Sequence, residues 1–178
     1  MALRQLVTRF DDRVDDLFMP LRGRPLPDRI CYLASEGADY SRIWHAIGLT
    51  MALVSPSRRR HSLRLAVALG VESALVNGVI KNVFGRERPP MLEARAYEVR
   101  RPRTRSFPSG HASSACVTAV LLTDAMPGLR PLWWALATTV SASRIHNRMH
   151  HASDVVAGAA IGTALGVAIR RAWPMRSR

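Results

Sequence analysis

The sequence predicts an all-α protein that crosses a membrane several times. Apolar stretches of helical length recur along the 178 residues, and no segment of useful length alternates apolar and polar residues as a strand would. The last apolar stretch is uncharged and carries a ridge of glycines. We therefore expect one domain over residues 1–178, built as a multi-pass membrane helical bundle of about five spanning helices with an N-terminal amphipathic helix.

The first 19 residues predict the amphipathic helix. Apolar side chains recur at helical spacing on one face, and charged side chains occupy the other. The apolar set is Leu3, Leu6, Val7, Phe10, Val14, Leu17 and Phe18. Such a helix either lies in the membrane interface or packs on the rest of the domain. Prolines and a glycine within residues 20–27 then break the chain, so we separate an N-terminal segment, 1–36, from a helical core, 37–173.

Five apolar stretches follow, at roughly 41–55, 63–83, 110–126, 131–145 and 153–172. A spanning helix needs about 20 mostly apolar residues, and some of these stretches are shorter or carry an acid such as Glu72. Hydropathy alone therefore leaves a soluble helical bundle open. The last stretch favours the membrane, because Gly158, Gly162 and Gly166 recur every four residues, as in closely packed membrane helices. In a soluble helix each glycine would cost about 1 kcal/mol relative to alanine.

The chain is strongly basic, with a formal net charge of +13. Basic chains bind nucleic acid, anionic membranes or small anionic substrates. Aromatic residues make up only 6% and the arginines are spread along the chain, so we expect no nucleic-acid partner. Cys31 and Cys116 form neither a metal-site spacing nor a disulfide framework. Arg4, Arg9 and Asp11 interrupt the first apolar residues, so we expect no cleaved signal peptide.

The chemically suggestive residues lie at four helix ends that a spanning topology brings to one side of the membrane. They occupy the segments 81–89, 108–111 and 143–154. The candidates for holding a phosphate are Lys81, Arg88, Ser109, Gly110 and Arg144. The candidates for catalysis are His111, His150 and Asp154.

These residue types can bind a phosphate without a metal ion. An arginine presents a planar fork to two phosphate oxygens, and a lysine presents a point charge. Ser109 offers a hydroxyl, and Gly110 opens a helix whose first N–H groups form an anion site. We therefore expect no cofactor and no metal.

The two histidines suggest covalent catalysis. His150 and Asp154 are four residues apart, which on a helix places them on one face, so the carboxylate would orient the imidazole as a nucleophile. His111 would protonate the leaving oxygen and later deprotonate water. The spacing of His146 and His150 also fits a shared metal ion, but no supporting Glu or Cys accompanies them.

Taken together, the pattern Lys-x6-Arg-Pro, Pro-Ser-Gly-His, Ser-Arg-x5-His-x3-Asp resembles the three-part signature of the type 2 phosphatidic acid phosphatase superfamily. All eleven signature positions match, and the one lysine of the chain, Lys81, falls where the signature has lysine. The resemblance implies a membrane lipid phosphate phosphatase that hydrolyses a phosphomonoester or pyrophosphate through a phosphohistidine. It also implies the residue roles given above.

The chain departs from the family pattern in two ways. Membrane members commonly have six spanning helices, and here the amphipathic N-terminus takes the place of the first. The connection at 90–107 is short and basic, which would leave the site open to the lipid phase. Its arginines are Arg95, Arg100, Arg101, Arg103 and Arg105.

The compact size and arginine-rich composition are similar to those of actinobacterial family members that dephosphorylate decaprenylphosphoryl-5-phosphoribose in cell-wall synthesis. Polyprenyl pyrophosphate, phosphatidylglycerol phosphate and phosphatidic acid are the alternative substrates. A vanadium-dependent haloperoxidase and a non-enzymatic basic membrane protein are the alternative classes. We expect a bacterial plasma-membrane protein whose partners are the lipid substrate and membrane lipids. Arginines at the end opposite the site favour a site that faces outward.

Overall fold

The structure is a computed structural model that describes residues 1–91, 97, 99–102 and 104–175. Every regular element among these residues is helical. The α-helices are α1 (Ala2–Phe18), α2 (Pro25–Ala38), α3 (Arg42–Val54), α4 (Arg59–Ser73), α5 (Lys81–Val83), α6 (Gly110–Ala125), α7 (Arg130–His146) and α8 (Ala152–Ala172). A π-helical segment, η4 (Ala74–Ile80), joins α4 to α5 in one long rod. The all-α prediction is confirmed for the described residues.

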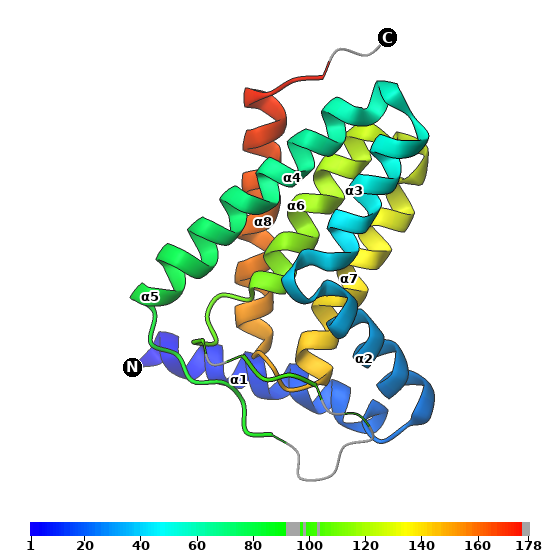
Figure 1. Ribbon diagram of the computed structural model, residues 1–178. Helices are drawn as coiled ribbons and strands as arrows, with labels where there is room; N and C mark the ends of the chain where they lie inside the picture. The colour runs from blue at the N-terminus through cyan, green and yellow to red at the C-terminus, as the bar shows by residue number, and fades with distance from the viewer. Residues whose placement is uncertain (92–96, 98, 103, 176–178) are drawn as a thin grey trace.

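The helix α6 forms the centre of the bundle, with α4, α7 and α8 packed around it (Figure 1). Every residue from Ala112 to Leu122 is buried, so α6 is enclosed on all sides, and its buried polar side chains are the small ones of Ser113, Ser114 and Thr118. A helix without a charged, solvent-exposed face is stable only when other helices enclose it. The end of this helix that carries Gly110 and His111 is therefore held rigidly inside the bundle.

The glycine ridge of α8 lies directly against the backbone of α6. A Cβ atom at Gly158 would sit 2.3 Å from the carbonyl oxygen of Ser109, and one at Gly162 would sit 2.1 Å from that of Ser113. Real Cβ atoms do not approach a carbonyl oxygen so closely, so these two positions need glycine. The expected close helix approach is confirmed, and it joins the start of α6 to the start of α8.

The outer face of the long α4–η4–α5 rod is apolar and exposed. Its exposed side chains recur about every four residues along one face: Leu63, Val67, Val71, Leu75, Val79 and Val83. Two helical segments of the described chain, Pro56–Val83 and Ala152–Ala172, are long and apolar enough to cross a membrane, with mean hydropathies of 1.6 and 1.7. Only 33% of each apolar window is buried within the protein, so most of this apolar surface faces outward.

The N-terminal helix α1 lies across one end of the bundle (Figure 1). Its packing is inverted relative to a helix on a soluble domain, because Asp11 is buried while Leu3, Leu6, Phe10 and Leu17 are exposed. The polar face of α1 therefore contacts the protein, and the apolar face points away from it.

The prolines and glycine expected to break the chain within residues 20–27 are followed by a helix that the sequence analysis did not expect. Residues Pro25–Ala38 form α2, which packs against α7. The prolines do not prevent this helix, because Pro25 and Pro27 occupy its first turn, where the missing N–H groups would have had no helical partner. The break is limited to the turn at Gly23, whose φ is 80°.

Candidate active site

Four helix ends meet at the end of the bundle that α1 covers (Figure 1). A cleft of about 940 Å³ opens there, which is large enough for a phosphorylated headgroup and part of a chain. Five of the eight candidate residues line it: Lys81, Arg88, Gly110, His111 and His150. The other three, Ser109, Arg144 and Asp154, are fully buried directly behind the lining. The structure thus brings together segments that lie up to about 70 residues apart in the sequence.

His150 lies on the floor of the cleft with only 2% of its surface exposed. Its Nε2 atom is 3.1 Å from Nη1 of Arg88, and its Nδ1 atom is 3.9 Å from Oδ2 of Asp154. Since an arginine can only donate, the lone pair of His150 is at Nε2 and the proton is at Nδ1, toward Asp154. This is the tautomer that a nucleophilic Nε2 requires.

The spacing of His150 and Asp154 predicted that the two residues share one face of a helix, and this prediction was wrong. His150 lies in the turn before α8, and the helix begins only at Ala152. A capping box brings the two residues together: His151 is the N-cap, and its backbone N–H donates to Oδ2 of Asp154 at 3.0 Å. The turn therefore folds back over the first turn of α8, which leaves the His150–Asp154 separation longer than a hydrogen bond.

Two residues outside the predicted set hold the Asp154 carboxylate. The Ser106 hydroxyl donates to Oδ2 at 2.6 Å, and Nη1 of Arg86 donates to Oδ1 at 2.7 Å. Charge-assisted bonds of this kind keep a buried carboxylate ionised. Arg86 lies inside the predicted segment 81–89, but no local spacing pairs it with Asp154, which lies 68 residues later.

His150 is held in its neutral form. Burial lowers the pKa of its imidazole well below the usual 6.5, and the charges of Arg144 and Arg88 act in the same direction, whereas Asp154 opposes them. A neutral imidazole keeps the lone pair that a nucleophile needs.

The cations take up different positions around the cleft. Arg88 donates to the carbonyl oxygens of Met149 at 2.6 Å and Thr104 at 3.0 Å, which fixes its guanidinium beside His150. Burial and then the charge of Arg101 lower the pKa of Arg88 to about 10, so it stays charged at neutral pH. Lys81 is 7% exposed and lines the cleft at the end of the long rod.

Arg144 is completely buried, and its guanidinium is only partly satisfied. Nη1 donates to the hydroxyl of Ser35 in α2. Its Nε and Nη2 atoms are buried and have no hydrogen-bond partner among the described residues. Buried donors without partners are rare in folded proteins, and an anion bound beside Arg144 would accept both of these hydrogen bonds.

Within the Pro-Ser-Gly-His segment, Ser109 caps helix α6 and Gly110 lines the cleft. Ser109 is the N-cap of α6: its hydroxyl accepts the N–H of Ala112 at 3.4 Å, and its own N–H donates to the carbonyl oxygen of Asp154 at 3.0 Å. Ser109 therefore holds the start of α6 in place behind the cleft, whereas Gly110 forms part of the cleft wall. A Cβ atom at Gly110 would lie 3.1 Å from Oδ1 of Asn77, so glycine keeps this wall open.

His111 is paired with an acid that the sequence analysis did not single out. Its Nε2 atom is 2.8 Å from Oδ1 of Asp39, which follows α2. Burial acts to raise the pKa of Asp39, but the hydrogen bond with His111 and the charges of His111 and Arg144 outweigh it, so the pKa lies below its usual value. Asp39 is therefore an anion at neutral pH.

The described part of the 90–107 connection forms one wall of the cleft. Arg100 lies over the ring of Tyr40 at 5.0 Å from its centre, and Arg101 donates to the carbonyl oxygen of Pro89 at 3.1 Å. Both arginines line the cleft. Arg95 and Arg103 lie outside the described residues.

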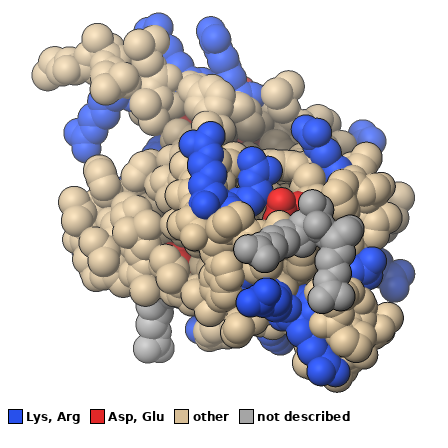
Figure 2. Space-filling model, turned by 90° about the horizontal axis from the view of Figure 1, so that it is seen from above, with Lys and Arg blue, Asp and Glu red and all other residues tan. Residues whose placement is uncertain are grey.

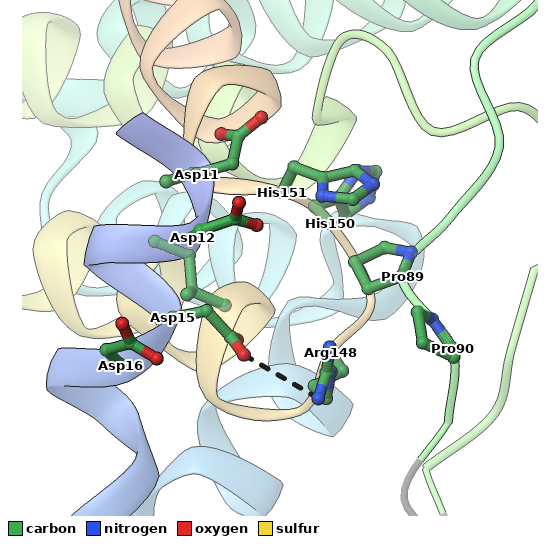
Figure 3. A pocket seen from close by; sticks show the side chains of 11 residues that line it. Asp11, Asp12, Asp15, Asp16, Pro89, Pro90, Arg148, His150 and His151 are labelled. Atoms are coloured by element: carbon green, nitrogen blue, oxygen red, sulfur yellow. Dashed lines mark ion pairs between the residues drawn. The ribbon is translucent and has the colours of Figure 1, made fainter. Parts of the chain in front are cut away.

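A second cavity of about 300 Å³ lies on the other side of His150 and His151 (Figure 3). Four aspartates of the α1 polar face line it: Asp11, Asp12, Asp15 and Asp16. Arg148 closes one side through an ion pair with Asp15 at 3.6 Å. His146, which the sequence paired with His150 for a metal, instead contacts Asp28 of α2 at 2.7 Å.

Comparison with known proteins shows the family to which the chain belongs. The model of the PAP2 superfamily matches residues 61–178, a range that contains all eight candidate residues. The chain belongs to the PAP2 superfamily. Its relatives in this superfamily are phosphatases, so the chain is an enzyme of the phosphatase class.

Several curated members of the superfamily are similar in sequence. The decaprenylphosphoryl-5-phosphoribose phosphatase of Mycobacterium tuberculosis is 36% identical over 126 residues, which cover 71% of this chain and 69% of the relative. The enzyme of the same name from Mycolicibacterium smegmatis is 35% identical over 139 residues, or 78% of this chain and 74% of the relative. The lipid A 1-phosphatase of Porphyromonas gingivalis is 37% identical over 107 residues, but these cover only 21% of that protein.

Solved PAP2 structures share the fold. The transmembrane phosphatidylglycerolphosphate phosphatase of Bacillus subtilis superposes with a TM-score of 0.71 at 23% identity, covering 97% of this chain and 90% of that one. Aquifex aeolicus LpxE gives a TM-score of 0.68 at 22% identity, with 89% and 93% covered. The helical bundle is therefore the fold of membrane PAP2 phosphatases.

Proposed function

We propose that this PAP2 protein is a metal-independent lipid phosphate phosphatase that works through a phosphohistidine at His150. The observation that carries the proposal is that His150 lines the cleft with its Nε2 atom beside Arg88 and its Nδ1 atom toward Asp154. A neutral imidazole with its lone pair among cations is suited to attack an anionic phosphorus centre.

In the first step, Nε2 of His150 attacks phosphorus in line with the leaving oxygen. The P–N bond forms as the bond to the lipid alcohol breaks. His111 gives its proton to the departing oxygen, so a neutral alcohol leaves. Asp154 stabilises the positive charge that develops on the His150 ring.

In the second step, His111 takes a proton from water as that water attacks phosphorus. The P–N bond breaks, inorganic phosphate leaves, and His150 regains its neutral form. One residue thus acts first as acid and then as base. Each step needs the charge on the three phosphoryl oxygens to be stabilised throughout.

Three cations and a helix end supply that stabilisation. The two unpartnered donors of Arg144, within the part of the chain that the structure describes, match a pair of phosphoryl oxygens. Arg88 and Lys81 approach from the wall of the cleft, and the first N–H groups of α6 come from Gly110 and His111. Ser109 holds that helix end in place as its N-cap.

The shape of the cleft supports a lipid substrate. Its lining follows the rod from Lys81 back to Ala66, about 22 Å at 1.5 Å per residue. The part near Ala66 and Leu69 is apolar, and the part near Lys81 is charged. A lipid could therefore place its phosphate among the cations while its chain runs along the apolar part.

We further propose about five spanning helices, α3, the α4–η4–α5 rod, α6, α7 and α8, within one domain of 178 residues. The exposed apolar stripe of the rod supports contact with lipid. The exposed Leu3, Leu6 and Phe10 support a place for α1 in the membrane interface beside the site.

The distribution of charge supports a site that faces outward from a bacterial plasma membrane. The opposite end of the bundle carries basic side chains, seen end-on in Figure 2. The exposed ones are Arg58, Arg59, Arg60, Arg130, Arg170 and Arg171. Basic ends tend to stay in the cytoplasm.

A polyprenyl-linked phosphate such as decaprenylphosphoryl-5-phosphoribose is the proposed substrate, because relatives with that name cover more than two thirds of the chain. Phosphatidylglycerol phosphate, phosphatidic acid and polyprenyl pyrophosphate are the substrates to compare with it.

The test is phosphate release from these four lipids by detergent-purified protein, with EDTA present. His150→Gln should lower kcat by roughly three orders of magnitude or more, because the nucleophile is lost. His61→Gln is the matched control, since His61 lies in the first turn of α4, at the far end of the bundle. EDTA should have no effect, and acid quenching should trap a phosphohistidine. Release that survives His150→Gln, or that EDTA abolishes, would contradict the proposal.

A further inference from the structure

We propose that Asp39 is the positioning residue of His111, so that each imidazole of the cleft has its own carboxylate. This inference rests on the proposed function, because it concerns the acid–base step of that mechanism. Oδ1 of Asp39 lies 2.8 Å from Nε2 of His111, within hydrogen-bond distance. Both side chains are largely buried, at 9% and 16% exposed.

The hydrogen bond with Asp39 decides which nitrogen of His111 can exchange a proton with the substrate. The Asp39 carboxylate accepts the N–H at Nε2, so Nδ1 is the nitrogen left for the substrate. When Nδ1 is protonated, the ring is a cation and the carboxylate stabilises it; when Nδ1 has given up its proton, the same bond keeps the ring in place. His111 can therefore alternate between acid and base without turning its ring.

The backbone holds Asp39 rigidly in this position. The next two residues, Tyr40 and Ser41, both have left-handed conformations, with φ of 53° and 58°. Few side chains adopt this conformation unless the surrounding structure demands it. Here it turns the chain sharply between α2 and α3 at the edge of the cleft, with Arg100 stacked over Tyr40.

Helix α2, which ends at Ala38 directly before Asp39, is fastened to α7 and to Asn147 after it. Asp28 contacts His146 at 2.7 Å, the Asn147 side chain donates to the carbonyl oxygen of Cys31 at 3.1 Å, and Arg144 donates to Ser35. These contacts run along the length of α2 toward Asp39. The phosphate-binding Arg144 and the Asp39–His111 pair are thus positioned by one rigid unit.

Asp39→Asn tests the proposal, and Asp28→Asn is its matched control, because Asp28 is also an α2-region acid bonded to a histidine but does not line the cleft. With a lipid alkyl phosphate, Asp39→Asn should lower kcat roughly 10²-fold while KM changes little, since the acid is mispositioned. With p-nitrophenyl phosphate, whose leaving group needs little protonation, the first-turnover burst should stay within about threefold of wild type. Asp28→Asn should either leave both the alkyl phosphate rate and the p-nitrophenyl phosphate burst unchanged or lower the two by the same factor.

A loss in Asp39→Asn that is the same for both leaving groups, or no loss at all, would overturn the proposal. Nitrogen-15 spectra of histidine-labelled protein give a reading independent of turnover: the Nε2–H signal of His111 should be strongly shifted in wild type and not in Asp39→Asn, and an unchanged signal would also overturn it. Failure of the proposed function would show separately, as phosphate release that survives His150→Gln.

Discussion

Arg86 links Asp11, near the start of the chain, to Asp154, the carboxylate beside His150. Its Nη2 atom donates to Oδ2 of Asp11 at 2.5 Å, and its Nη1 atom donates to Oδ1 of Asp154 at 2.7 Å. Asp11 also accepts the backbone N–H of Ser153 at 2.7 Å. The inverted helix α1 is therefore connected to the active site through its buried polar face.

Asp11→Asn should loosen this connection. The amide keeps the shape of the side chain but loses the charge that Arg86 and Ser153 bind, so we expect the free energy of unfolding to fall by about 1–3 kcal/mol. Thermal unfolding in detergent measures the change. Asp12→Asn is the control, because Asp12 is exposed on the same helix, and it should change stability by less than about 0.5 kcal/mol. Equal effects of the two variants would contradict the assigned role of Asp11.

Acidification should destabilise the protein through His150. Because burial places the folded pKa of His150 well below 6.5, the unfolded chain binds a proton more readily than the folded one. The stabilisation is therefore complete above pH 6.5 and is lost as the pH falls from 6.5 toward the folded pKa. The thermal midpoint of wild type minus that of His150→Gln should be constant above neutrality and decrease below it. A difference that does not vary between pH 7 and pH 5 would rule out a buried neutral imidazole.

Arg144→Lys should impair phosphate binding although the charge is kept. A lysine cannot donate to Ser35 and also offer two parallel donors to a phosphate, as we propose for Arg144. We expect kcat/KM to fall roughly 10²-fold. Arg171→Lys is the control, because Arg171 is exposed in the last turn of α8 at the end of the bundle opposite the cleft, and its effect should be under about twofold. A wild-type kcat/KM for Arg144→Lys would show that the two parallel donors of the Arg144 guanidinium do not bind the phosphate.

Gly162→Ala should separate α6 from α8. The added methyl group would lie 2.1 Å from the Ser113 carbonyl oxygen, and backbone cannot yield as a flexible side chain can. We expect a loss of about 1–3 kcal/mol or more in stability. Gly37→Ala in α2, where a methyl group meets nothing within 4 Å, should be neutral or slightly stabilising. Differential scanning calorimetry of both variants in detergent measures the two changes in stability, and equal thermal midpoints would contradict the prediction.

The sequence predicted the apolar helices well because length and punctuation by proline and glycine define them. The stretch expected at 110–126 is α6 at Gly110–Ala125, and the stretch expected at 153–172 is α8 at Ala152–Ala172. It missed α2, since prolines in a first turn look the same in a sequence as prolines that break a chain.

The candidate residues were found because each belongs to a short segment with a recognisable spacing. Asp39 and Ser106 have no such neighbours, and only the packing of distant helices brings them to His111 and Asp154. The sequence also placed His150 on a helix, because i,i+4 spacing is the same for a helix and for the capping turn that precedes one.

The glycine contact between α6 and α8 also limits how this enzyme can be altered. The backbone N–H of Ser109 donates to the carbonyl oxygen of Asp154 at 3.0 Å, next to Gly158, so main-chain geometry fixes the separation of the segments that carry His111 and His150. Libraries that seek new substrates should therefore leave this seam untouched. They should instead vary the residues of the rod between Ala66 and Asn77 that line the cleft, along the path that we propose for the lipid chain.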